Sequence, residues 1–170
     1  IADFLLLIAR NEDKIGVFIV ETDRNGITRR DMQGLLGNRA SHIAEIEFEN
    51  VMVPRENVLG SLDYGMNKTV SVALDIGRYN TAWAGVALAQ ACLEEMVSYT
   101  RTRSQFGKKI RTYQLIQKMI GDAVTNIHAA KALALKAGEL RKKNDPNYAN
   151  ETTMAKYFSS RITMQVAEDA

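Results

Sequence analysis

The chain has 170 residues, of which 46% are hydrophobic and 25% charged, and its 22 basic and 20 acidic residues leave a net charge of +2. This balance is ordinary for a globular protein and implies neither nucleic acid nor a membrane surface as a partner. No stretch approaches the roughly 18 uninterrupted apolar residues of a membrane span, so no such span is predicted.

The first third of the sequence predicts β-strands. Three runs of strand length carry continuous or alternating apolar side chains, at residues 4–9, 16–21 and 43–51. A polar hairpin connection is predicted at residues 11–14, and Asn25-Gly26 predicts a type I′ turn, because that turn needs two positive φ angles. Strands at this spacing indicate a small antiparallel barrel or sheet.

Helical spacing follows a linker bracketed by Pro54 and Gly60. Three long helices are predicted, at about residues 64–102, at about 113–142, and from about residue 150 onward. The first is apolar nearly all round, which is typical of a helix inside a bundle, so Trp83 is predicted to be buried and no strand is expected after residue 70. The predicted fold class is α+β: a partial antiparallel β barrel or sheet in residues 1–60, then three long antiparallel helices of a four-helix bundle in residues 61–170.

Neither a disulfide nor a metal site is predicted. Cys92 is the only cysteine and lies in an apolar helical run, where a small core residue is typical. His42 and His128 lie far apart in sequence, without cysteine or carboxylate at ligand spacing. The chain begins inside a strand pattern without Met and ends at Ala170 inside a helical pattern, so we expect it to be a piece of a longer protein.

A polar and aromatic run, RSQFGK at residues 103–108, lies at the predicted corner between the first two helices and is followed by Tyr113 and Gln114. Arg103 offers a rigid fork of donors that suits a pyrophosphate, and Gln114 can pair with an adenine or ribose edge. Phe106 can lie beside an adenine. Plainer roles remain open: Arg103 is also favoured at a helix C-terminus by the helix dipole. Phe106 can simply close the hairpin core, and Tyr113 and Gln114 can serve as helix caps.

Asp75 and Arg78 are three residues apart on the first predicted helix and therefore share a face. They can pair with each other or present a carboxylate and a guanidinium to a ligand. The sequence leaves both readings open.

In this order and spacing, these stretches resemble the acyl-CoA dehydrogenase family, from the end of its middle β domain through most of its C-terminal helical bundle. The matching stretches are residues 1–3, 36–60, 75–78, 103–114 and 155–170. The resemblance implies an FAD-dependent oxidoreductase of fatty acid metabolism, which dehydrogenates an acyl-CoA thioester between its α and β carbons and transfers hydride to the flavin.

The same resemblance implies the site residues and partners. Five residues are expected to bind FAD, with the Arg and Gln reaching across a subunit interface: Arg103, Gln105, Phe106, Tyr113 and Gln114. Asp75 and Arg78 are expected to border acyl-CoA. A homodimer or homotetramer, an electron-transfer flavoprotein as electron acceptor, and a location in the bacterial cytoplasm or the mitochondrial matrix are also implied.

No catalytic residue is expected within this chain. The family's usual glutamate base would follow Ala170, and the alternative position on the first long helix is occupied by Gly77, which has no side chain. Residues 1–170 alone are therefore expected to be inactive and prone to self-association. An acyl-CoA oxidase, a dehydrogenase of carrier-bound acyl groups and a non-catalytic helical oligomerisation module remain alternatives.

Overall fold

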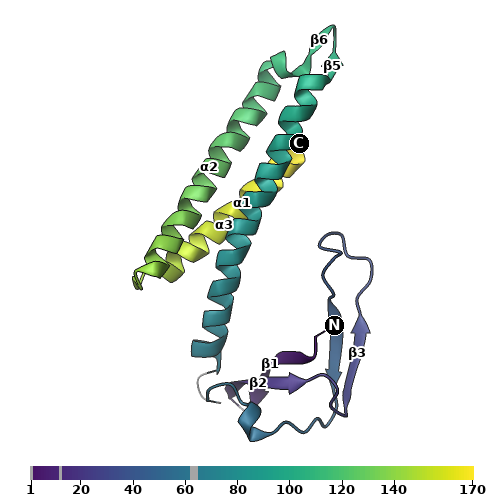
Figure 1. Cartoon of the computed structure of the whole chain (residues 1–170), viewed down its shortest axis with the longest axis vertical. Coiled ribbons are helices and arrows are strands. Elements are labelled where there is room, and N and C mark those ends of the chain that lie inside the picture. The colour runs from purple at the N-terminus through teal and green to yellow at the C-terminus, as the bar shows by residue number, and fades with distance from the viewer. Residues whose placement is uncertain (1, 12, 62–64) are drawn as a thin grey trace. The chain divides into compact units, whose positions relative to one another are not determined.

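The computed structural model describes residues 2–11, 13–61 and 65–170 and divides into two compact units, residues 1–72 and 73–170 (Figure 1). The first unit contains four strands and two short helical segments: β1 (Phe4–Asn11), β2 (Lys14–Glu21), β3 (Ile27–Asp31), β4 (Ala44–Phe48), η1 (Arg55–Asn57) and the π-helical η2 (Gly65–Val70). The second is built on three long helices, α1 (Ser71–Thr102), α2 (Gln114–Lys142) and α3 (Tyr148–Asp169). The predicted α+β class is confirmed.

The strands of the first unit form two separate antiparallel ladders. β1 pairs with β2 from Phe4 opposite Glu21 to Asn11 opposite Lys14, and β3 pairs with β4 from Ile27 opposite Phe48 onward. An isolated bridge joins Phe18 of β2 to Val58 after η1. The described strands do not close a barrel. Glu12, part of the predicted hairpin connection, lies outside the described residues.

The predicted type I′ turn at Asn25-Gly26 is wrong, because β2 and β3 belong to different ladders and Asn25 does not have a positive φ. Gly26 does, with a φ of +90°, and the N–H of Ile27 donates to the carbonyl of Arg24 at 3.4 Å. A positive φ at the third position of a turn is typical of type II. Glycine is also required by space, since a Cβ there would lie 2.2 Å from the carbonyl oxygen of Glu49.

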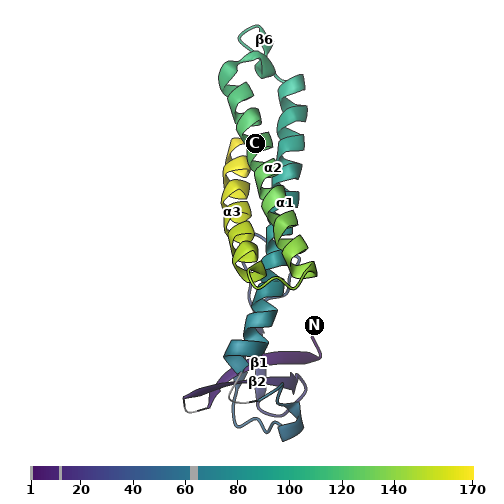
Figure 2. The ribbon, with the colours of Figure 1, turned by 90° about the vertical axis from the view of Figure 1, so that its left-hand side faces the viewer.

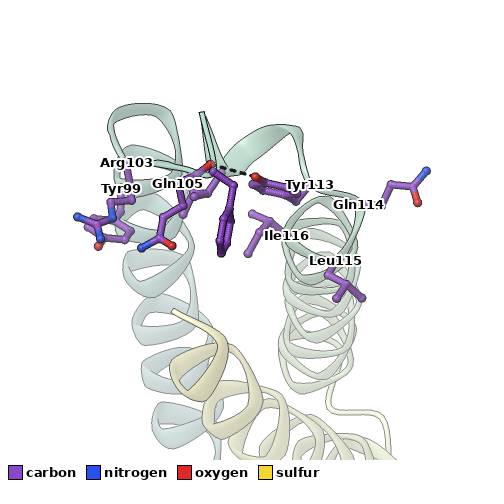
Figure 3. A pocket seen from close by; sticks show the side chains of 9 residues that line it. Tyr99, Arg103, Gln105, Tyr113, Gln114, Leu115 and Ile116 are labelled. Atoms are coloured by element: carbon purple, nitrogen blue, oxygen red, sulfur yellow. Dashed lines mark hydrogen bonds between the residues drawn. The ribbon is translucent and has the colours of Figure 1, made fainter. Parts of the chain in front are cut away.

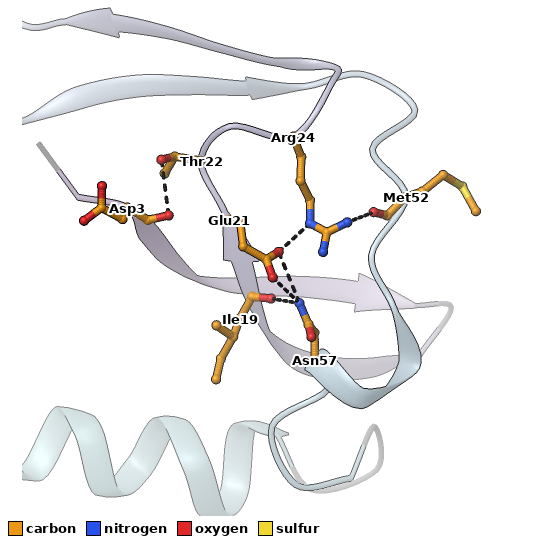
Figure 4. A network of polar contacts seen from close by, with 7 residues as sticks. All are labelled: Asp3, Ile19, Glu21, Thr22, Arg24, Met52 and Asn57. Carbon is orange, nitrogen blue, oxygen red and sulfur yellow. Dashed lines mark hydrogen bonds and ion pairs between the residues drawn. The ribbon is translucent and has the colours of Figure 1, made fainter.

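A polar network fastens the segment after β4 to the end of β2 (Figure 4). The side-chain amide of Asn57 donates to the carbonyl of Ile19 at 2.8 Å and to the carboxylate of Glu21 at 3.3 Å. Arg24 binds the same carboxylate and donates to the carbonyl of Met52 at 3.0 Å. The hydrogen bond from Arg24 is the main cause that lowers the pKa of Glu21 from 4.5 to about 2.

The helices of the second unit follow one another in alternating directions (Figures 1 and 2). Their core is rich in alanine, which lets the backbones approach closely; its fully buried alanines are Ala82, Ala89, Ala130, Ala134, Ala137 and Ala155. Between α1 and α3, the hydroxyl of Thr163 donates to the carbonyl of Gly85 at 2.8 Å. None of the helices among the described residues has the length and hydropathy needed to cross a membrane.

Three details of the helical unit differ from the prediction. Trp83 is half-buried, although it packs against the alanine-rich core of the helices. Because α2 and α3 cover only part of α1, apolar side chains such as Leu74 and Leu88 remain about half exposed, at 47% and 57%. Strands also occur after residue 70, since β5 (Ser104–Gln105) and β6 (Lys108–Lys109) form a short hairpin. The predicted domain boundary after residue 60 stays a prediction about the complete domains.

Candidate functional site

The corner between α1 and α2 is a tight hairpin followed by the 3₁₀ helix η3 (Ile110–Thr112). Gln105 of β5 pairs with Lys108 of β6, so Phe106 and Gly107 form a two-residue turn. Their φ angles are +50° and +78°, and two positive φ angles are the signature of a type I′ turn. The corner thus holds the turn type that the sequence analysis assigned to Asn25-Gly26.

Phe106 is held in a backbone conformation that bulky residues rarely adopt. The left-handed region costs an L-residue roughly 1–2 kcal/mol, and Phe106 gains little packing in return because it is 90% exposed. Strain of this kind is concentrated at functional sites. The predicted alternative that Phe106 closes the hairpin core is therefore wrong.

An open pocket with a volume of about 640 Å³ lies at this corner (Figure 3). All five residues predicted to bind a cofactor line it: Arg103, Gln105, Phe106, Tyr113 and Gln114. Four more residues, which the sequence analysis missed, complete its mainly apolar lining: Tyr99, Ile110, Leu115 and Ile116. The helical period offered a signal for Tyr99, because it lies one turn before Arg103.

Tyr113 holds the pocket together. Its hydroxyl donates to the carbonyl of Gln105 at 2.9 Å, and the ammonium of Lys108 lies 4.3 Å from the centre of its ring. Tyr113 occupies the N-cap position of α2, but its side chain makes no capping hydrogen bond. The predicted capping role of this side chain is therefore wrong, and its contacts brace the hairpin instead.

The side chains of Arg103 and Gln114, the two residues best suited to bind a ligand, have no partner among the described residues. Arg103 is exposed and makes no ion pair with any residue in the described part of the chain, and Gln114 makes no side-chain hydrogen bond there. Gln114 points away from the other labelled residues, on the outer side of the first turn of α2 (Figure 3). One ligand that touches both side chains must therefore extend beyond the pocket.

Asp75 and Arg78 do not pair with each other, so that reading of the two is wrong, while their expected place beside acyl-CoA stays a prediction. Both terminal nitrogens of Arg141 on α2 bind one carboxylate oxygen of Asp75 on α1, and Asp75 is only 7% exposed. The guanidinium lies 5.3 Å from the ring centre of Tyr79 and 5.1 Å from that of Tyr148. Arg141 was missed, because nothing in the sequence relates it to a residue 66 positions away.

Gly77 faces open space on α1, since a Cβ built there meets no atom within 4 Å. Its lack of a side chain is thus not a packing requirement of this chain. Across the residues that the structure describes, no three His, Cys, Asp or Glu side chains gather in a way that could hold a metal ion.

Comparisons with known proteins agree with this architecture. Residues 64–170 match the family model described as the acyl-CoA dehydrogenase C-terminal domain. The caffeyl-CoA reductase–Etf complex subunit CarC of Acetobacterium woodii is 34% identical over 156 residues, which are 92% of this chain and 41% of that protein. The chain thus spans about two fifths of the length of such relatives.

Two solved structures extend the similarity to the whole fold. A chain in the structure of the electron transferring flavoprotein of Acidaminococcus fermentans has a TM-score of 0.92 at 33% identity, covering 99% of this chain and 45% of that one. A glutaryl-coenzyme A dehydrogenase in complex with glutaryl-CoA has a TM-score of 0.90 at 32% identity, covering 99% and 44%. With the family model matching more than half of its residues, this chain belongs to the acyl-CoA dehydrogenase family.

Proposed function

We propose that the protein containing this chain is an FAD-dependent acyl-CoA dehydrogenase, which removes hydrogen from the α and β carbons of an acyl-CoA thioester. The observation that carries the proposal is the corner pocket in a chain of this family. There Arg103, which makes no ion pair with the described residues, lies among aromatic and apolar side chains. When bound, the flavin supplies the hydride acceptor, which no amino-acid side chain provides. In this proposal, the residues of this chain bind and orient the flavin and the acyl-CoA.

The donor set of the pocket fits a dinucleotide cofactor. Arg103 supplies a fork of N–H donors for a diphosphate, and the amides of Gln105 and Gln114 match the edges of an adenine or ribose. Phe106, exposed on the turn, provides an aromatic face on which a base can lie. In this proposal Arg103 and Gln114 reach a cofactor held mainly by an adjacent subunit, which requires a homodimer or homotetramer.

Helix α1 carries the residues that we propose to contact acyl-CoA. Arg78 is exposed and offers its guanidinium to the phosphate groups of acyl-CoA. The proton at the α carbon must be removed by a group outside the α1 motif, because Asp75 is bound to Arg141 and Gly77 has no side chain.

We further propose an electron-transfer flavoprotein as the electron acceptor, since two similar proteins bear Etf or electron transferring flavoprotein in their descriptions. We also propose that the protein is located in the bacterial cytoplasm or in the mitochondrial matrix.

A flavin spectrum tests the proposal directly. The purified protein is expected to show flavin absorbance that bleaches when an acyl-CoA is added without oxygen. Rapid reoxidation by oxygen would instead identify an oxidase, and bleaching only by carrier-bound acyl groups would identify a carrier-dependent dehydrogenase. A colourless protein that does not take up FAD would contradict the proposal and favour a non-catalytic oligomerisation module.

A further inference from the structure

The turn between β2 and β3 places an exposed asparagine directly before a glycine. Asn25 is the only asparagine of the chain that glycine follows, and both residues are exposed. Neither the side-chain amide of Asn25 nor the backbone N–H of Gly26 makes a hydrogen bond with the described residues. An unbonded backbone nitrogen therefore lies next to an unbonded side-chain carbonyl group.

We propose that Asn25 is a site of spontaneous deamidation. The nitrogen of Gly26 attacks Cγ of Asn25, its proton passes to the leaving amide nitrogen, and ammonia departs as a cyclic succinimide forms. Water then opens this ring at either of its carbonyl carbons, which gives aspartate or isoaspartate. Water is the only co-reactant, and it reaches the turn through an open hollow of about 610 Å³ that Asn25 helps to line.

The residue after Asn25 favours this attack over the same reaction at other exposed asparagines. Asn38 and Asn50 are also exposed and have positive φ angles, but they precede Arg39 and Val51. A side chain on the following residue shields its nitrogen and restricts the rotation that brings the nitrogen to Cγ, whereas glycine has no Cβ. Asn38 and Asn50 are therefore matched controls within the same molecule.

The turn itself offers little resistance to the rotation that the attack requires. The N–H of Ile27 donates to the carbonyl of Arg24 at 3.4 Å, and the N–H of Arg24 donates to the carbonyl of Glu21 at 3.5 Å. Both distances exceed the usual range of about 2.7–3.2 Å, so these hydrogen bonds are weak. The peptide between Asn25 and Gly26 can therefore rotate without the loss of a strong contact.

Isoaspartate at this position would disturb the start of the β3–β4 ladder, because it inserts the side-chain methylene into the main chain. Gly26 has no room to move, since its carbonyl accepts from the N–H of Glu49 at 2.8 Å and a Cβ on it would lie 2.2 Å from the carbonyl oxygen of Glu49. On the other side of Asn25, Arg24 is held by the carbonyl of Met52 at 3.0 Å (Figure 4). The added length must therefore break the contact between Gly26 and Glu49 or release Arg24.

The test incubates the folded protein containing this chain at mildly alkaline pH and follows its peptides by mass spectrometry, with enzymatic methylation of isoaspartate as a second readout. We expect the peptide with Asn25 to gain the mass of deamidation while the peptides with Asn38 and Asn50 stay unchanged. Asn25→Gln keeps the amide but would need a larger ring that forms more slowly, so no deamidation is expected at this position in that variant. Circular dichroism checks that the incubated protein remains folded.

Hydrogen exchange tests the structural consequence. Protein that contains isoaspartate is expected to lose protection of the Glu49 amide, whereas Asn25→Asp, with the same charge and a normal main chain, is expected to keep it. An Asn25 that stays unmodified, or that converts no faster than Asn38 and Asn50, would overturn the proposed site. Conversion to isoaspartate with full protection of the Glu49 amide would overturn the proposed effect on the ladder.

Discussion

The hydroxyl of Thr163 on α3 donates a hydrogen bond at 2.8 Å to the carbonyl of Gly85 on α1, 78 positions earlier in the sequence. The contact depends on the missing side chain, because a Cβ on Gly85 would lie 3.1 Å from the hydroxyl of Thr163 and 3.2 Å from that of Ser159. Gly121 on α2 is the opposite case, with no atom within 4 Å of an added Cβ. The two glycines thus form a matched pair.

Gly85→Val is expected to destabilise the protein by about 1–3 kcal/mol more than Gly121→Val, because only the first forces two packed helices apart. Urea denaturation followed by circular dichroism measures both free energies of unfolding. Equal effects of the two substitutions would contradict the close packing of α1 on α3.

Arg103→Ala is expected to weaken FAD retention by one to two decades while leaving the fold intact, because a lost charge-assisted pair to phosphate is worth roughly 1.5–3 kcal/mol. Arg111→Ala is the control, since Arg111 is exposed at the same corner but does not line the pocket. The flavin-to-protein ratio after gel filtration and the Kd for FAD report the outcome. An unchanged ratio in Arg103→Ala would reject this role.

Phe106→Gly is expected to raise stability by about 1 kcal/mol, because glycine adopts the left-handed conformation without the steric cost. The same variant is expected to bind FAD more weakly, since the exposed aromatic face is lost. A higher melting temperature together with weaker FAD binding would show that the strained backbone at Phe106 serves cofactor binding. A loss of stability would show that the exposed ring packs on something within the protein.

The ion pair between Glu21 and Arg24 predicts that the first unit loses stability at acidic pH. The pKa of Glu21 is lowered to about 2, so its contribution to stability is present above the unfolded pKa near 4.5 and is lost as the pH falls toward 2. Glu21→Gln is expected to remove this part of the pH dependence, measured by hydrogen exchange of the β1–β2 amides. Glu47→Gln, at an exposed position on β4, serves as the control and is expected to preserve it.

Residues 1–170 by themselves are expected to show no acyl-CoA-dependent dye reduction, even with FAD added. Asp75 is bound to Arg141, Gly77 has no side chain, and Glu94 and Glu95 match neither family base position, so we expect none of these α1 residues to act as the base. The half-exposed apolar side chains of α1 are also expected to favour self-association, which gel filtration measures. Turnover by this chain would show that the base has been misplaced.

The sequence by itself determined the three long helices, three of the strands and five of the nine residues that line the corner pocket. The two continuous apolar runs correspond to β1 and β2, the period-two run at residues 43–51 contains β4, and the helical spacing corresponds to the three long helices. The five predicted cofactor residues lie within twelve positions of one another, so a single helix–hairpin–helix corner suffices to bring them together. Local sequence is enough where the site itself is local.

Only the tertiary structure decided which partners distant residues take. The sequence placed Asp75 beside Arg78, but packing of α1 against α2 supplied Arg141, and a buried carboxylate binds the cation that shares its burial. The strand ladders likewise decided that Asn25-Gly26 closes no hairpin, while the pairing of β5 with β6 placed the type I′ turn at Phe106–Gly107. Such choices depend on contacts between elements, and the periodicity of one element does not encode them.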